Sequence, residues 1–64
     1  MTIKTAFIAE DEPLARETIR DAVNQRSELH LIGEAADGVS ALEQINRLQP
    51  EVLFMDIQMQ ERTG

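Results

Sequence analysis

Near its start the chain reads Ala6-Phe7-Ile8-Ala9-Glu10-Asp11-Glu12-Pro13, an apolar run that ends in three acids and a proline. Closer to its end it reads Val52-Leu53-Phe54-Met55-Asp56, a second apolar run that also ends in a carboxylate. Short, continuously apolar runs are typical of strands that are covered on both faces. If both runs are parallel strands of one sheet, Glu10, Asp11 and Asp56 gather at its carboxyl edge, where ligands bind in open α/β sheets.

The whole sequence predicts three strands that alternate with two helices. We expect strands over residues 3–9, 29–35 and 51–56, and helices over residues 13–26 and 38–48. Pro13 favours a helix start, because the N–H that proline lacks would be unpaired there anyway. Pro50 ends the second helix, because the residue before a proline is pushed out of the helical region. This β-α-β-α-β order predicts an α/β fold with parallel strands joined by right-handed crossovers.

The first helix is predicted to be amphipathic. Its apolar stripe comprises Ala15, Ile19, Ala22 and Val23, and its solvent-facing side comprises Arg16, Glu17, Arg20 and Asp21. Either Asp11 or Glu12 is placed to cap the N-terminus of this helix or to complement its dipole. Glu12 and Arg16 are four residues apart, so we expect an ion pair worth roughly a few tenths of a kcal/mol.

The second helix follows the Asp37-Gly38 turn, and Asp37 is its expected N-cap. The residues predicted to face the sheet are Ala41, Leu42, Ile45 and Leu48. Glu43 and Arg47 form the favourable four-residue spacing for an ion pair on the other side. Met55 and Met59 are expected to pack rather than to bind a ligand, and His30 has no second histidine with which to form a metal site.

Composition narrows the classes of function. The chain has 64 residues, enough for one domain at most, and 42% of them are hydrophobic, which argues against disorder. A net charge of −6 opposes direct binding to nucleic acid and suits a cation site or a basic partner. There are no cysteines, which excludes disulfides and thiolate metal sites and fits a reducing compartment. No segment fits a signal peptide or a membrane span, so we expect a cytoplasmic protein.

The three grouped carboxylates suggest a divalent cation site. Mg²⁺ prefers oxygen ligands, which Glu10, Asp11 and Asp56 would supply. Carboxylates this close repel one another, so a proton or a cation is needed to hold them together. An aspartate beside a metal can also attack phosphorus and form an aspartyl-phosphate. Each acid alone has a plainer interpretation, as a helix cap or a turn residue; it is their joint placement at two strand ends that favours a site.

Three segments resemble the receiver domain of bacterial response regulators. They are residues 7–16, with the acidic pair; residues 37–42, with the start of the second helix; and residues 52–59, with the aspartate after an apolar strand. The string Glu12-Pro13-Leu14-Ala15-Arg16 is also similar to regulators with a LytTR-type output domain. The resemblance implies a flavodoxin-like, doubly wound parallel sheet, of which this chain is a βαβαβ half with strand order 2-1-3.

The resemblance also implies roles for individual residues. Asp56 is the expected phospho-acceptor, and the phosphoryl donor is a phosphohistidine on a sensor histidine kinase. Glu10, Asp11 and Asp56 are the expected ligands of Mg²⁺, together with the backbone carbonyl of Gln58. The resemblance implies that a full receiver domain would promote its own phosphotransfer and dephosphorylation. We do not expect residues 1–64 to be an enzyme.

The sequence departs from the family pattern at two positions. Glu10 stands where the family often has Asp, and Gln60 stands where it usually has Pro. In addition, the family's hydroxyl residue after a fourth strand and its lysine after a fifth strand have no counterpart within residues 1–64. We therefore expect residues 1–64 to be a truncated receiver domain, its N-terminal half, in which phosphorylation is impaired.

Two other interpretations remain open. In the order 2-1-3 the third strand is an edge strand, and its apolar run would be available to pair with a second copy. The chain would then be a self-associating half-domain, a homo-oligomer joined through that strand. Alternatively, it is a protein-interaction module that is not phosphorylated.

Overall fold

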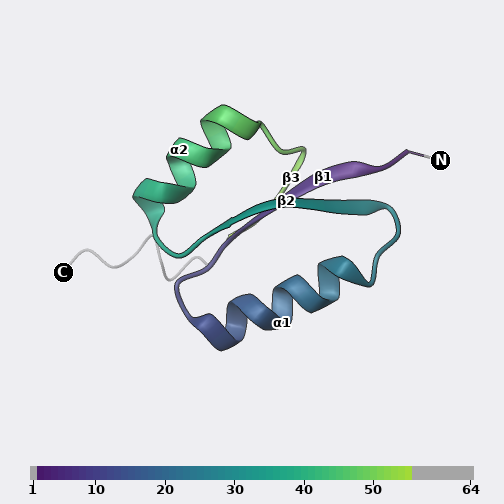
Figure 1. Cartoon of the computed structure of the whole chain (residues 1–64), viewed down its shortest axis with the longest axis horizontal. Helices are drawn as coiled ribbons and strands as arrows, with labels where there is room; N and C mark the ends of the chain where they lie inside the picture. Colours follow the sequence, from purple (N-terminus) through teal and green to yellow (C-terminus); the bar gives the residue numbers. More distant parts are fainter. Residues whose placement is uncertain (1, 56–64) are drawn as a thin grey trace.

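The computed structural model describes residues 2–55 of the 64-residue chain. Its elements are β1 (Lys4–Ala9), α1 (Pro13–Asn24), β2 (Leu29–Ala35), α2 (Gly38–Leu48) and β3 (Val52–Met55). The strands form a parallel sheet in the order β2-β1-β3, and a helix follows each of the first two strands (Figure 1). The predicted α/β class and the strand order 2-1-3 are confirmed.

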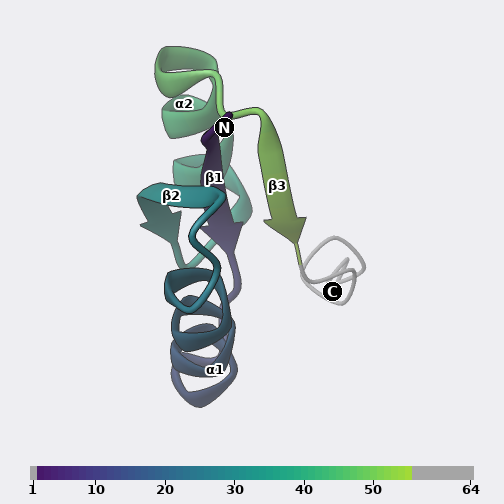
Figure 2. The same cartoon turned by 90° about the vertical axis from the view of Figure 1, so that its right-hand side faces the viewer.

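The two helices cover opposite faces of the sheet, as Figures 1 and 2 show. Successive side chains of a strand point to opposite faces, and β1 uses both. Ala6 and Ile8 pack on the α1 side, whereas Phe7 and Ala9 pack on the α2 side. All four are fully buried. This explains why β1 is continuously apolar instead of alternating with polar residues.

Each face of the sheet has its own apolar cluster. The α1 side comprises Ala6, Ile8 and Val23, with Ile19, Leu29, Leu31, Val52 and Phe54 packed around them. The α2 side comprises Phe7, Ala9, Ala35 and Ala41, with Ile45, Leu48 and Met55 packed around them. The predicted packing role of Met55 is confirmed. β1 is the middle strand of the sheet and contributes buried residues to both clusters.

A register shift in β2 changes which side chains face which helix. Ala6 lies opposite Leu31, but Phe7 lies opposite Gly33, so Ile32 is an extra residue in β2. A bulge of one residue moves the side chains that follow it to the other face. As a result Leu31 packs on the α1 side and Ala35 packs on the α2 side.

The helix ends agree closely with the predicted signals. Glu12 is the N-cap of α1, and its carboxylate accepts a hydrogen bond from the backbone N–H of Ala15 at 2.9 Å. Asp37 caps α2 by accepting from the N–H of Ser40 at 2.8 Å. Gln49, with a φ of 51°, closes α2 in the left-handed conformation that often ends helices.

Several expected details were wrong. β1 begins at Lys4 instead of residue 3, and α1 ends at Asn24, two residues earlier than expected. Leu42, which was expected to pack, is 63% exposed, because it borders the open hollow between α2 and β3. Within residues 2–55, no ion pair forms between Glu43 and Arg47.

Candidate functional site

Glu10 follows β1 directly and is hydrogen-bonded through both its backbone and its side chain. Its backbone N–H donates to the carbonyl of Ala35 at 3.0 Å, which ties it to the end of β2. Its carboxylate accepts from the N–H of Glu12 at 3.1 Å, and its backbone carbonyl accepts from the guanidinium of Arg16 at 2.9 Å. Glu10 is only 5% exposed, although it carries a charged group. A buried acid is retained only with such partners, so the orientation of this carboxylate is well defined.

The three consecutive acids have different environments. Glu12 is exposed, and its carboxylate is used to cap α1. Asp11 is half-buried, between the end of β1 and the start of α1. Of the two residues predicted as possible caps, Glu12 fills that role. The carboxylates of Glu10 and Asp11 therefore stand at the carboxyl end of the central strand, and we call this pair the acidic corner.

The third predicted ligand, Asp56, follows β3 in the sequence. Ala9 is in register with Met55, and the next residues in the sequence are Glu10 and Asp56. Asp56 itself lies outside the described residues, as do Gln58 and Met59. Within residues 2–55 there is no cluster of three His, Cys, Asp or Glu side chains suited to hold a metal ion. The part of the site that the structure describes is therefore the acidic corner alone.

His30 is remote from the acidic corner. It is exposed on β2 and lies opposite Thr5, towards the amino end of the parallel strands. The acidic corner lies beyond Ala9, at the carboxyl end.

A cluster that the sequence did not predict lies beside the acidic corner. Arg20 of α1 donates two hydrogen bonds to the carboxylate of Glu34 on β2, at 2.7 and 3.1 Å. The guanidinium of Arg16 lies 3.6 Å from the same carboxylate. The pKa of Arg20 is raised above its ordinary value. The larger cause is the hydrogen bond to Glu34, and the second is the negative charge of that carboxylate.

These contacts correct two predictions. Arg16 and Arg20 were assigned to the solvent-facing side of α1, yet both are partly buried against β2. Arg16 was also expected to pair with Glu12, whereas its guanidinium reaches Glu10 and Glu34. The bulge in β2 is the reason, because it places Glu34 opposite Ile8 and therefore on the α1 face. Nothing in the spacing of the charged residues of α1 signals that change of face.

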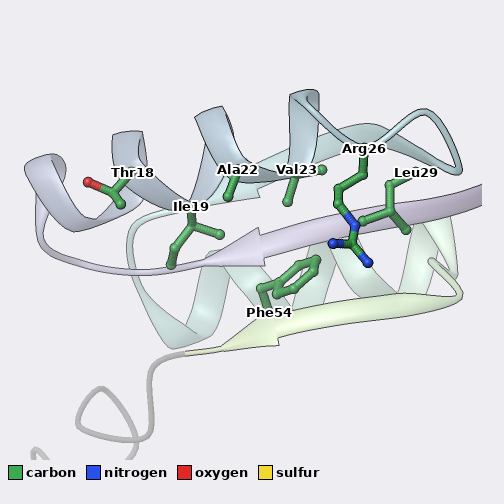
Figure 3. Close-up of a pocket in the computed structure, with 7 residues that line it drawn as sticks. All are labelled: Thr18, Ile19, Ala22, Val23, Arg26, Leu29 and Phe54. Carbon is green, nitrogen blue, oxygen red and sulfur yellow. The ribbon is translucent and has the colours of Figure 1, made fainter.

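Two apolar hollows flank the edge strand β3. The first lies between α1 and β3 and has a volume of about 400 Å³. Figure 3 shows Phe54 of β3 pointing across this hollow towards α1, on the side where Val23 and Arg26 lie. The second, of about 530 Å³, lies between α2 and β3 and includes Leu42 and Met55 in its lining. β3 is thus packed less completely than β1.

No helix within residues 2–55 has the length and apolar character that crossing a bilayer requires. This finding concerns α1 and α2, which comprise 12 and 11 residues.

Comparison with known proteins shows the family of the chain. The model of the response regulator receiver domain matches residues 6–64. An uncharacterized response regulatory protein of Vibrio vulnificus is 43% identical over 60 residues, which are 94% of this chain and 25% of the relative. The transcriptional regulatory protein BtsR of Escherichia coli K12 is 40% identical over 58 residues, which are 91% of this chain and 24% of the relative. The chain thus spans about a quarter of these relatives.

A solved structure agrees with this result. The signal receiver domain of the response regulator NarL from Mycobacterium tuberculosis superposes with a TM-score of 0.86 at 32% sequence identity. The match covers 92% of this chain and 48% of the NarL receiver chain. Three observations agree. They are the parallel strand order β2-β1-β3, the acidic corner after β1 and the family match over residues 6–64. This chain belongs to the response regulator receiver domain family.

Proposed function

We propose that this chain is the phospho-acceptor portion of a two-component response regulator, with Asp56 as the acceptor and a sensor histidine kinase as the donor. Family membership is one support. The observation that carries most weight is the register of Ala9 with Met55 at the carboxyl edge of the sheet. The buried carboxylate of Glu10 and the side chain of Asp56 follow these two residues in the sequence.

We also propose that Glu10, Asp11, Asp56 and the backbone carbonyl of Gln58 hold Mg²⁺. The acidic corner suits this ion, because both of its side chains offer oxygen donors and Glu10 is oriented by hydrogen bonds before any ion binds. The negative net charge of the chain also favours the binding of a cation. When bound, Mg²⁺ would offset negative charge on the transferring phosphoryl group.

The residues of the chain perform the transfer. A carboxylate oxygen of Asp56 attacks phosphorus, the O–P bond forms, and the P–N bond of the phosphohistidine breaks. The histidine leaves as a neutral imidazole after it has taken up a proton. The product is an acyl phosphate on Asp56, and no oxidant or reductant is required.

We further propose that residues 1–64 correspond to the N-terminal half of a receiver domain in the cytoplasm. The 48% coverage of the NarL receiver chain supports this correspondence. The matched part of the NarL chain is about half of it, so residues 1–64 tested as an isolated peptide supply only part of the surroundings of the acceptor. For that peptide we expect weak Mg²⁺ binding and impaired phosphorylation. Direct contact with nucleic acid is not expected from a segment with a net charge of −6.

The test is incubation with acetyl phosphate and Mg²⁺, followed by intact mass spectrometry. We expect a small phosphorylated fraction that disappears in Asp56→Ala and persists in Asp21→Ala, a control at an exposed aspartate of α1. Phosphorylation that survives in Asp56→Ala would contradict the assignment. A large phosphorylated fraction would show that the acidic half-site is sufficient. No phosphorylation and no amide shifts at Glu10 and Asp11 on Mg²⁺ titration would overturn the proposed function and favour an interaction module.

The second candidate function is self-association through β3. It is favoured by the position of β3 at the edge of the sheet within the described residues, and by Leu53, which is 44% exposed there. An unpaired apolar edge strand is a template for pairing with another chain. A two-fold contact between two copies of β3 would pair them antiparallel, with the same patch on both subunits.

A further inference from the structure

We propose that Arg16 is a positioning residue for the acidic corner, which it holds between α1 and β2. The consequence for Mg²⁺ rests on the proposed function, but the positioning itself does not. Arg16 is neither a candidate ligand nor a candidate phospho-acceptor. Its contacts are with the backbone of Glu10 and with the side chain of Glu34.

The first contact fixes the chain at the point where β1 ends. Arg16 donates to the carbonyl of Glu10 at 2.9 Å, from a side chain that is 22% exposed. Glu10 is buried, so loss of this donor would leave its carbonyl without that partner in a site with little access to water. The neighbouring peptide groups, which carry Glu10 and Asp11, would then turn towards another donor.

The second contact anchors Arg16 itself. Its guanidinium forms an ion pair with Glu34, 3.6 Å from a carboxylate oxygen, and Arg20 holds that carboxylate with two hydrogen bonds. A planar guanidinium can contact two acceptors at fixed angles, which an ammonium group cannot do. The order of contacts therefore runs from Arg20 through Glu34 and Arg16 to the carbonyl of Glu10.

The bulge in β2 makes this arrangement available. Because Ile32 is an extra residue, Glu34 lies opposite Ile8 on the α1 face, where Arg16 and Arg20 are. Ala35, the next residue, accepts from the backbone N–H of Glu10. Two adjacent residues of β2 thus hold the acidic corner, one directly and one through Arg16.

Positioning and simple electrostatics predict opposite results when the charge of Arg16 is removed. A guanidinium near a cation site repels the cation, so removing it should strengthen Mg²⁺ binding if charge alone mattered. If Arg16 positions Glu10, removing it should weaken Mg²⁺ binding by about tenfold or more, as is typical when the support of a metal ligand is lost.

The experiment uses backbone NMR of the full 64-residue chain and three variants, Arg16→Gln, Arg16→Lys and Arg26→Gln. Arg26 is the matched control, because it carries the same charge, lies just beyond the C-terminal end of α1 and pairs with Glu28 at the surface. Amide shifts are recorded without Mg²⁺, and MgCl₂ is then titrated. Arg16→Gln should displace the amide signals of residues 10–12 in the ion-free protein and raise the dissociation constant for Mg²⁺. Arg16→Lys should restore both only in part, and Arg26→Gln should match the original chain.

The other outcomes are equally clear. Unchanged amide signals at residues 10–12 in Arg16→Gln, or Mg²⁺ binding as tight as in the original chain, would overturn the positioning role. Full restoration by Arg16→Lys would show that one N–H donor to the carbonyl of Glu10 is sufficient, and would overturn the part assigned to the planar guanidinium. If the original chain gives no response to Mg²⁺, the proposed cation site fails, whereas the ion-free amide signals still decide whether Arg16 positions Glu10.

Discussion

The aromatic ring of Phe7 occupies the space in front of Gly33, its register partner on the neighbouring strand. A Cβ atom at position 33 would lie 2.8 Å from Cε2 and 3.0 Å from Cδ2 of Phe7, and 3.2 Å from Cδ1 of Leu48. Phe7 is fully buried between β2 and α2, so its ring has no free space into which to move. A glycine is therefore required where the bulge of β2 meets the core.

The first prediction concerns this close approach. Gly33→Ala should lower the free energy of unfolding by about 1–3 kcal/mol, because an added methyl group overpacks the cluster of Phe7 and Leu48. Urea denaturation followed by circular dichroism measures the change. Gly38→Ala is the matched control, because a Cβ there meets no atom within 4 Å. It should leave stability unchanged or raise it by about 0.4–1 kcal/mol. Equal effects of the two substitutions would contradict the packing argument.

The second prediction concerns the start of α2. Asp37→Ala should cost about 1 kcal/mol of stability, because the N–H of Ser40 loses the carboxylate that accepts its hydrogen bond. Asp37→Asn keeps a side-chain oxygen acceptor and should lose much less. Thermal melting of the three proteins makes the comparison. A loss in Asp37→Asn as large as in Asp37→Ala would show that the capping bond is not the cause.

The third prediction concerns pH. Hydrogen bonding to Glu34 raises the pKa of Arg20, so the stabilisation linked to its proton is complete below the unfolded-state pKa and is lost as the pH rises through the folded-state value. Arginine titrates only in strongly alkaline solution. The difference in unfolding free energy between the original chain and Arg20→Gln should therefore be constant from about pH 6 to about pH 9. It should shrink as salt is added. A difference that changes within this pH range would assign the effect to another group.

The fourth prediction concerns the edge strand. If the chain self-associates through β3, Leu53→Lys should favour the monomer, because a lysine on an edge strand discourages pairing. Leu14→Lys is the control, since Leu14 is 71% exposed on α1 and distant in sequence from β3. Sedimentation velocity over a range of concentrations should show association in the original chain and in Leu14→Lys, and less in Leu53→Lys. A monodisperse monomer in the original chain would refute self-association.

The sequence predicted best those features that depend on local signals. The range of β2, the start of α1 at Pro13 and the Asp37 cap of α2 all follow from nearby residues and are confirmed. The partner of Arg16 was predicted wrongly, because helical spacing points to Glu12 and cannot show what lies across the interface. Leu42 was placed on the packed face for a similar reason, although only the contacts of α2 decide where that face ends.

The sequence alone determined the order of elements, the parallel α/β sheet and the presence of carboxylates at the end of β1. These features follow from apolar runs, proline positions and capping residues, which act over a few neighbouring positions. Only the tertiary structure decided that Ile32 is an extra residue and that Glu34 therefore faces α1. The physical reason is that the register of a strand with its neighbour decides which of its side chains point to each face of the sheet. Here the register places Gly33 opposite the ring of Phe7.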